Sequence, residues 1–297
     1  MDHALNLELL TPENFGDYAL LDSGDFQKLE RFGKYITIRP EPQALWQPSQ
    51  TMTEWEKQAH VVFVPKSSSS GEWKKLKQMP DQWEITYTLS KDSIIKLRLG
   101  LTAFKHVGVF PEQAVNWKRI YGFMKGRSSA KFLNLFAYTG GASLAARAAG
   151  AEVTHVDSIK QVVTWANENR QLSQLDNIRW MIDDAMKFVK KEIRRENRYQ
   201  GIILDPPAYG HGPNGEKWKL EDNIAEMMDG VLALLDPQQH QLILNAYSLG
   251  FSALVPNNLL QPFAIKNKST LTTGELYLPD AFNKRLPLGV WGCLTKS

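Results

Sequence analysis

Four polar segments each follow an apolar run in the second half of the chain. They are Asn134–Gly141, Asp157, Asp183-Asp184 and Asp205–Tyr209. Apolar runs of this kind that alternate with helical patterns predict parallel β-strands, and ligands of open α/β sheets bind outside the carboxyl ends of such strands. The spacing therefore predicts a nucleotide-type cofactor site with a reaction site beside it.

The first segment, NLFAYTGG, runs from Asn134 through Tyr138 and Thr139 to Gly140 and Gly141. We expect Asn134 to contact the cofactor, as we do for Ser158 further along the chain. Glycine lets the backbone approach a ligand closely, and the helix that follows presents N–H groups to a negative group. The G-x-G-x-x-G pattern of dinucleotide sites is missing, which disfavours a dehydrogenase and favours a carboxylate over a pyrophosphate as the bound group. A tight turn with no ligand is the other interpretation.

The acids that end the next two apolar runs suit a nucleoside. Asp157 stands where an acid binds the hydroxyl pair of a ribose, although Asp157 or Ser158 could instead cap a helix. Asp184 could accept a hydrogen bond from the adenine amine, with the Ala185 N–H facing a ring nitrogen. We favour Asp184 over Asp183 for this contact, because alternation along the strand turns one of the two side chains outward. Helix capping is again the alternative interpretation.

Asp205, Pro206, Pro207 and Tyr209 form the most specific element, and we predict that they are the catalytic residues. Two prolines end a strand rigidly and hold their carbonyls in a fixed array. Asp205 and these carbonyls can accept hydrogen bonds from a planar N–H group, and Tyr209 can stack on a base. The Gly-rich segment 210–222 that follows could be a mobile flap over a substrate.

The elements that position these residues alternate between strand and helix from residue 131 onward. We expect strands at 132–137, 152–156, 178–182, 199–204 and 241–248, with helices between them and a closing strand pair at 274–279 and 286–295. Gly150 should end the first of these helices. The pattern predicts an α/β fold with a Rossmann-like, seven-stranded, doubly wound sheet whose last pair is antiparallel.

Residues 1–98 differ, with β-branched and aromatic runs that predict a small β-rich N-terminal domain before a second domain at 99–297. The runs 83–90 and 93–102 should form a hairpin about Lys91-Asp92, and the serines at 67–70 indicate a disordered loop. This N-terminal domain could recognise a substrate or RNA.

Composition limits the other possibilities. The net charge of +3 is compatible with an RNA partner without requiring one, and the single cysteine, Cys293, excludes an internal disulfide. The chain shows no secretion signal, membrane span or metal-ligand cluster, so we expect a soluble cytoplasmic protein without a metal.

The motifs FLNLFAYTGGASLAARAAGAEVTHVD and LDPPAYG resemble the class I S-adenosylmethionine-dependent methyltransferases. With HVGVFPEQ upstream, residues 100–297 resemble the subgroup that modifies large-subunit (23S) rRNA and its uncharacterised relatives. The resemblance implies that residues 138–140 contact the methionine end of S-adenosylmethionine, Asp157 the ribose and Asp184 the adenine edge. It also implies that Phe110 and Gln113 line the cofactor pocket; from the residues alone, 108–113 would be a plain loop.

One departure from the subgroup bears on the chemistry. Members that methylate C5 of cytosine need a late cysteine nucleophile, whereas the segment 245–248 reads NAYS and Cys293 is expected in the core. We therefore expect methyl transfer to a base nitrogen, guanine N7 or N2, with rRNA or a ribosomal subunit as the partner. A small-molecule or protein methyltransferase, or a non-catalytic RNA-binding module, remains an alternative on the same fold.

Two basic segments and one histidine could serve an RNA partner. They are the helix with cations from Lys187 to Arg198, the lysines 66, 74, 75 and 77 around Trp73, and His211 beyond Tyr209. Each also has an ordinary interpretation as a solvated surface. The sequence does not indicate an oligomeric state.

Overall fold

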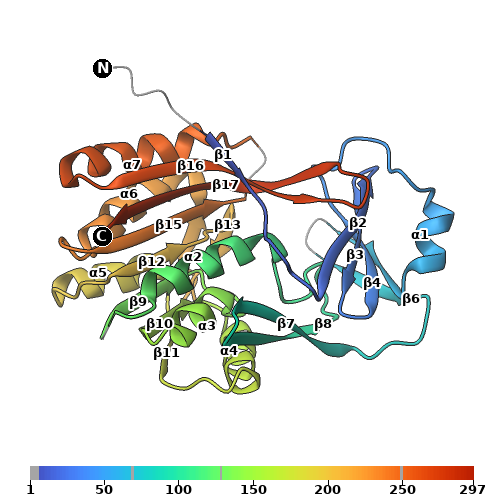
Figure 1. The fold of residues 1–297 in the computed structure, drawn as a ribbon, viewed down its shortest axis with the longest axis horizontal. Coiled ribbons are helices and arrows are strands. Elements are labelled where there is room, and N and C mark those ends of the chain that lie inside the picture. Colours follow the sequence, from blue (N-terminus) through green and yellow to red (C-terminus); the bar gives the residue numbers. More distant parts are fainter. Residues whose placement is uncertain (1–6, 68–69, 128, 248–249) are drawn as a thin grey trace. The chain divides into compact units, whose positions relative to one another are not determined.

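The computed structural model describes residues 7–67, 70–127, 129–247 and 250–297 (Figure 1), so the predicted loop at 67–70 lies partly outside the described residues. The chain forms two compact units. The larger unit comprises Met1–Leu10, Val115–Leu276 and Gly289–Ser297, and the smaller unit comprises Thr11–Ala114 and Tyr277–Leu288. The division into domains 1–98 and 99–297 stays a prediction.

An eight-stranded mixed sheet organises the larger unit, in the order β1-β16-β17-β15-β12-β9-β10-β11. Its strands are β1 (Leu7–Leu10), β9 (Lys131–Leu135), β10 (Glu152–Asp157), β11 (Ile178–Ile182), β12 (Gly201–Leu204), β15 (His240–Ala246), β16 (Thr270–Pro279) and β17 (Arg285–Lys296). Strands β9, β10, β11, β12 and β15 run parallel, and β17 is antiparallel to β15. The sheet has eight strands rather than the expected seven, because β1 pairs in parallel with β16 at the edge of the sheet.

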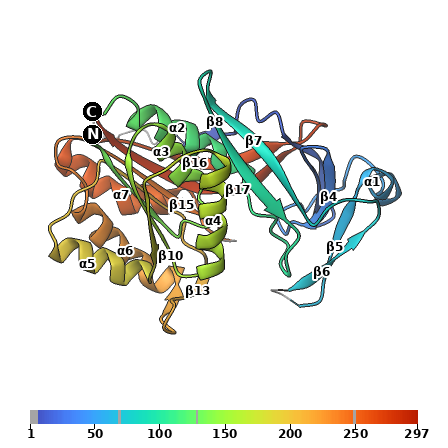
Figure 2. The ribbon, with the colours of Figure 1, turned by 90° about the horizontal axis from the view of Figure 1, so that it is seen from below.

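Helices cover both faces of this sheet, as expected for a doubly wound fold. They are α2 (Ala114–Met124), α3 (Gly141–Ala148), α4 (Lys160–Leu172), α5 (Ala185–Arg194), α6 (Leu220–Ala233) and α7 (Leu254–Asn267). Figure 2 shows α2, α3 and α4 on one face and α5, α6 and α7 on the other. Strand β9 ends at Leu135 rather than at residue 137, because Phe136 turns out of the strand with a positive φ of 55°.

The core of the larger unit lies between the sheet and helices α5, α6 and α7. Leu133, Leu204 and Leu244 from three neighbouring strands are fully or almost fully buried there, against Phe188 of α5 and Met227 of α6. Cys293 on β17 is 3% exposed, which confirms its expected place in the core. Within the described residues, no helix combines the length and apolarity that crossing a membrane requires.

The smaller unit is β-rich, as the sequence predicted. One sheet has the order β2-β3-β4-β5-β6, and a separate hairpin pairs β7 with β8. Their bounds are β2 (Tyr18–Gly24), β3 (Gln27–Phe32), β4 (Tyr35–Pro40), β5 (Val61–Pro65), β6 (Gly71–Lys75), β7 (Gln82–Ser90) and β8 (Ser93–Gly100). The β7–β8 hairpin turns at Lys91-Asp92, as expected. The unit also contains α1 (Met52–Gln58), which begins with a capping box of Thr51 and Glu54, and a 3₁₀ turn η1 (Pro111–Gln113).

The buried carboxylate of Asp22 holds several segments of the smaller unit together. It accepts hydrogen bonds from the backbone N–H groups of Ser49 and Gln50, from the Trp55 indole at 3.0 Å and from Lys284 Nζ at 2.8 Å. Burial by itself would raise the pKa of Asp22, but these donors together lower it below its ordinary value of 3.8. The charged carboxylate is therefore the form that stabilises this unit.

We predict that Asp22→Asn lowers the free energy of unfolding by about 2–3 kcal/mol at pH 7, since several donors lose a charged acceptor. A lowered native pKa gives stability that is complete well above pH 3.8 and is lost as the pH falls through that value. Denaturant unfolding over a pH series should show that the free energy of unfolding falls less steeply toward acidic pH in the variant than in wild type. Asp25→Asn, in an exposed turn, is the control; an equal loss there would contradict this role for Asp22.

Candidate functional site

The turn after β9 is the most strained backbone in the larger unit's site. Phe136, Tyr138 and Gly140 all have positive φ, of 55°, 49° and 89°. A left-handed backbone costs a residue with a side chain roughly 1–2 kcal/mol, and such strain concentrates at functional sites. Gly141 opens α3 where a Cβ would lie 2.5 Å from the Trp117 ring, so only glycine allows this helix start to pack so closely.

Asp157 at the end of β10 fixes this turn. One carboxylate oxygen accepts the Tyr138 N–H at 2.9 Å, and the other accepts the Ile159 N–H at 3.0 Å. Burial raises the pKa of Asp157, although these backbone donors oppose the shift. Helix α4 has Ile159 as its N-cap, so neither Asp157 nor Ser158 caps it, contrary to the alternative considered from sequence.

Beneath the turn, a buried polar chain joins β9, α3 and β10. Asn134 Nδ2 donates to Ser143 Oγ at 2.9 Å, and Ser143 Oγ lies 3.0 Å from His155 Nδ1. Asn134 and His155 are register partners on neighbouring strands, and burial lowers the pKa of His155 to about 3, which keeps the ring neutral. The Asn134 side chain thus positions the start of α3. This role differs from the predicted contact of Asn134 with the cofactor, which stays a prediction.

Ser143 and His155 were not anticipated as part of the site. The signal that could have found them is a polar residue inside an otherwise apolar strand, as in VTHV at 153–156. A buried polar side chain needs a partner, so such a residue predicts a second one nearby.

The two acids after β11 have different partners. Asp184 is the N-cap of α5 and accepts the Lys187 N–H at 2.9 Å, which confirms the capping alternative for it. Asp183 accepts the Asp184 N–H with one oxygen and binds Lys191 Nζ at 2.6 Å with the other. Asp184 has a second carboxylate oxygen with which it could accept from an adenine amine beside Ala185, and this contact stays a proposal.

The Asp205-Pro206-Pro207 turn follows β12, the strand next to β9. Leu204 and Leu135 are register partners, so this turn and the strained turn leave the sheet side by side. Asp205 keeps a partial opening to solvent, yet desolvation by its surroundings raises its pKa to about 6. Its carboxylate is therefore a better proton acceptor than an ordinary aspartate near neutral pH.

Trp218 joins the two turns, and sequence reasoning missed it. Its indole Nε1 donates to the Pro207 carbonyl at 2.7 Å, and its ring lies 4.9 Å from the ring of Phe136. Trp218 belongs to a short ribbon of two strands, β13 (Tyr209–His211) and β14 (Lys217–Lys219), formed by the predicted flap segment. One carbonyl of the predicted array is thus occupied by the indole.

The other predicted site residues lie in two places. Tyr209 begins β13 with 69% of its surface exposed, which leaves its ring free for stacking. Phe110 and Gln113 belong to the smaller unit, around the 3₁₀ turn η1, so their contact with a cofactor stays a prediction.

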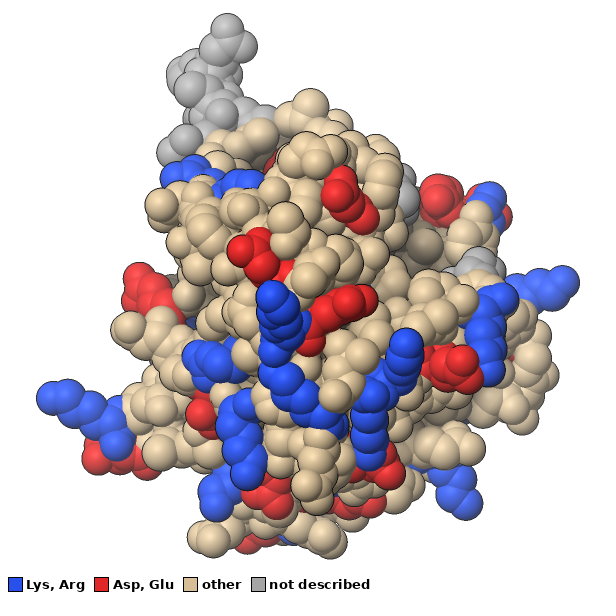
Figure 3. All heavy atoms as spheres, turned by 90° about the vertical axis from the view of Figure 1, so that its right-hand side faces the viewer, with Lys and Arg blue, Asp and Glu red and all other residues tan. Residues whose placement is uncertain are grey.

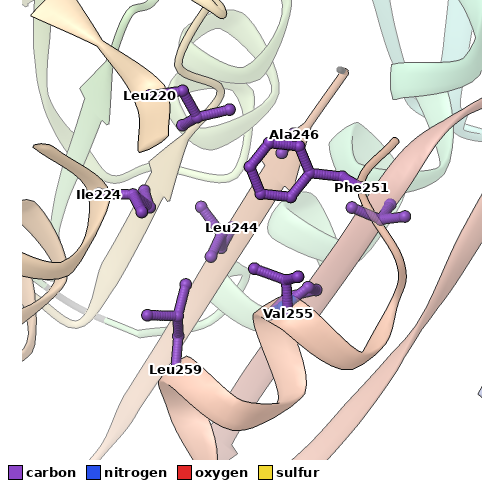
Figure 4. Close-up of a pocket in the computed structure, with 9 residues that line it drawn as sticks. Leu220, Ile224, Leu244, Ala246, Phe251, Val255 and Leu259 are labelled. Atoms are coloured by element: carbon purple, nitrogen blue, oxygen red, sulfur yellow. The ribbon is translucent and has the colours of Figure 1, made fainter. Parts of the chain in front are cut away.

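A small pocket under the carboxyl end of β15 is entirely apolar (Figure 4). Side chains from α6, β15, β17 and the start of α7 line it, among them Leu220, Leu244 and Val255, together with Phe251 from the segment before α7. Without a polar group it cannot satisfy the hydrogen bonds of a nucleoside, and we interpret it as a packing gap.

The strand order, with the antiparallel strand β17 between β16 and β15, is that of the α/β methyltransferase fold. Residues 26–257 match the family model of the S-adenosylmethionine-dependent methyltransferases, and the chain belongs to this family.

Solved structures of similar proteins have the same fold. A SAM-dependent methyltransferase from Agrobacterium tumefaciens is 35% identical with a TM-score of 0.89, over 98% of this chain and 94% of that one. The methyltransferase SMU.776, solved in complex with SAH, is 18% identical with a TM-score of 0.69, over 95% of this chain and 76% of its own, and shows the likeness of the fold alone.

Curated relatives are more distant. The ribosomal RNA large subunit methyltransferase K/L of Shewanella frigidimarina is 32% identical over 154 residues, which is 50% of this chain and 21% of that protein. The protein of that name from Vibrio cholerae is 26% identical over 193 residues, covering 60% and 25%. The matched region thus spans only a fifth to a quarter of the length of these relatives.

We predict that Gly140→Ala weakens S-adenosylmethionine binding at least about tenfold. The added Cβ forces a left-handed alanine and lies 3.2 Å from Ala166 Cβ, so the turn must shift. Gly150→Ala is the matched control: its φ of 98° is equally left-handed, but the added Cβ meets nothing within 4 Å. Calorimetric titration should show lost affinity only in the first variant, and equal affinities would contradict a cofactor role for the turn.

Proposed function

We propose that the protein methylates a nitrogen atom of an RNA base, with large-subunit rRNA as the substrate, and that no covalent cysteine intermediate forms. The observation that carries this proposal is the Asp205-Pro-Pro turn beside the strained turn, with the exposed ring of Tyr209 next to it. The distant relationship to rRNA methyltransferases supports the choice of RNA.

The larger unit's residues fit S-adenosylmethionine. The N-cap of α3 is Gly140, which makes no side-chain capping bond, so the helix start suits the carboxylate of the methionine end. Asp157 is held by two backbone donors and would accept from the ribose hydroxyls, and Asp184 and Ala185 would meet the adenine edge. The turn residues Tyr138 and Thr139 would approach the methionine end.

When bound, S-adenosylmethionine supplies a methyl group on a sulfonium centre, and the chain has to align the acceptor nitrogen with it. Asp205 would accept a hydrogen bond from an N–H of an exocyclic amine. The rigid proline turn and stacking on the Tyr209 ring would together fix the orientation of the base. As the nitrogen gains the methyl group, it must lose a proton, and the raised pKa of Asp205, about 6, suits the carboxylate to accept it. A proton acceptor here favours the guanine amine N2 over N7, because N7 carries no proton to lose.

The cysteine position supports chemistry without a covalent step. Cys293 lies in the middle of the sheet at 3% exposure, opposite Ile243, and burial raises the pKa of its thiol. A buried neutral thiol is a poor nucleophile.

We predict that Asp205→Asn lowers the methyl transfer rate about 100-fold or more, since the proton acceptor is lost. The measurement is transfer of labelled methyl groups to unmodified large-subunit rRNA, followed by digestion to nucleosides. Wild-type activity should fall as the pH drops below about 6, where Asp205 becomes protonated.

The same substitution has a readout besides activity. A carboxyl whose native pKa is raised costs stability above that pKa, so Asp205→Asn should unfold at a higher temperature than wild type at pH 8 but not at pH 4. Label that appears in protein or small molecules but not in RNA would overturn the proposed substrate. Full activity of the variant would overturn the role of Asp205.

A further inference from the structure

The β13–β14 ribbon has two chemically different faces. In an antiparallel pair, residues opposite each other share a face, and successive residues alternate. Gly210 and Trp218 are opposite each other, and Trp218 is buried. The other face carries the pairs Tyr209–Lys219 and His211–Lys217, and Tyr209, His211 and Lys217 are exposed. The outer face therefore combines one aromatic ring with three basic side chains.

The ribbon is fastened to the catalytic turn and to α5. Trp218 donates to the Pro207 carbonyl, and at the tip Glu216 pairs with Lys187 of α5 and accepts the Asn214 N–H at 2.9 Å. The bond to Lys187 is the leading cause that lowers the pKa of Glu216, so Glu216 carries its charge near neutral pH. The outer face is thus a platform held at a fixed place beside Asp205.

Many of the cations in the other basic segments of the chain are paired with acids. On α5, Lys187, Lys190 and Lys191 are paired with Glu216, Glu226 and Asp183. Near Trp73, Lys66 pairs with Glu72 and Lys75 with Asp81. Cations and acids are likewise interspersed on the face drawn in Figure 3.

The ribbon differs from those segments because one of its faces carries both free charge and an exposed aromatic ring, whereas the Trp73 indole donates to the Thr102 carbonyl. Lys219 is paired with Asp222, but Lys217 and His211 make no side-chain hydrogen bond or ion pair with any residue that the structure describes. A free ammonium group and an exposed ring side by side are the combination that binds single-stranded nucleic acid, through phosphate contact and base stacking.

We propose that the outer face of this ribbon binds the unpaired RNA strand next to the target base, with Lys217 and His211 at a phosphate of that strand and Tyr209 under the target base itself. Two residues of a strand span about 7 Å, so a base on Tyr209 and a phosphate at the His211–Lys217 pair lie about one extended nucleotide apart. This inference rests on the proposed RNA substrate and assigns part of its binding site.

The test is Lys217→Glu, with Lys266→Glu as its matched control. Lys266 is also exposed and makes no ion pair with a described residue. It lies near the end of α7, away from the carboxyl ends of the parallel strands. Binding of a fluorescent single-stranded RNA is measured by anisotropy over a salt series, with the same sequence as a duplex in parallel and with calorimetric titration of S-adenosylhomocysteine.

Lys217→Glu should weaken binding of the single strand about tenfold and reduce the slope of log affinity against log salt by about 0.7 or more, as expected for the loss of one phosphate contact. Lys266→Glu should bind like wild type, and both variants should keep their affinity for S-adenosylhomocysteine. Wild-type RNA affinity in Lys217→Glu, an equal loss in Lys266→Glu, or a duplex bound as tightly as the single strand would overturn the inference.

The two proposals fail in different ways. RNA that is methylated while Lys217→Glu binds it normally would overturn the ribbon inference and leave the proposed function in place. Salt-sensitive, Lys217-dependent RNA binding without methyl transfer to RNA would support the ribbon inference and overturn the proposed function.

Discussion

The hydrogen bond between the Asp157 carboxylate and the Tyr138 N–H, at 2.9 Å, is the constraint on which the proposed cofactor site depends. It ties the end of β10 to a turn whose Phe136 and Tyr138 are both left-handed. Such a backbone persists only when its surroundings hold it, and here Asp157 holds it from one side and the Asn134–Ser143–His155 chain from below. One acid thus shapes the turn, and the same acid is the one proposed to bind the ribose.

A second constraint brings the acceptor side to the same place. Strands β9 and β12 are neighbours, and Trp218 spans the turns that follow them through Phe136 and the Pro207 carbonyl. The two turns are therefore held together, which suits the proposed reaction, since methyl transfer depends on alignment. The same tryptophan belongs to the ribbon, so a residue outside every sequence motif links the proposed cofactor turn, the proposed catalytic turn and the proposed RNA platform.

Much of the fold followed from local patterns. Apolar runs that end in Gly, Asp or Asp-Pro-Pro predicted the parallel strands correctly, because strand geometry and turn chemistry are local, whereas the roles of the residues at the strand ends stay predictions. The eighth strand β1 could not be foreseen, since its pairing with β16 joins residues at opposite ends of the chain. For the same reason, the contacts of Trp218 with Pro207 and Phe136 could not be predicted, and the polar residue His155 inside an apolar strand indicates a partner without identifying it. Helix α1 had a local signal, the Thr51–Glu54 capping box, that was overlooked.

The most direct test of the central claim is calorimetric titration of wild type and Asp157→Asn with S-adenosylmethionine, with Asp176→Asn, an exposed acid, as the control. The amide loses the charge that holds the Tyr138 N–H and would bind the ribose, so affinity should fall at least about tenfold in Asp157→Asn, the equivalent of about 1.4 kcal/mol. Asp176→Asn should bind like wild type. Equal affinity in all three proteins would contradict the claim that Asp157 and the turn it holds form the cofactor site.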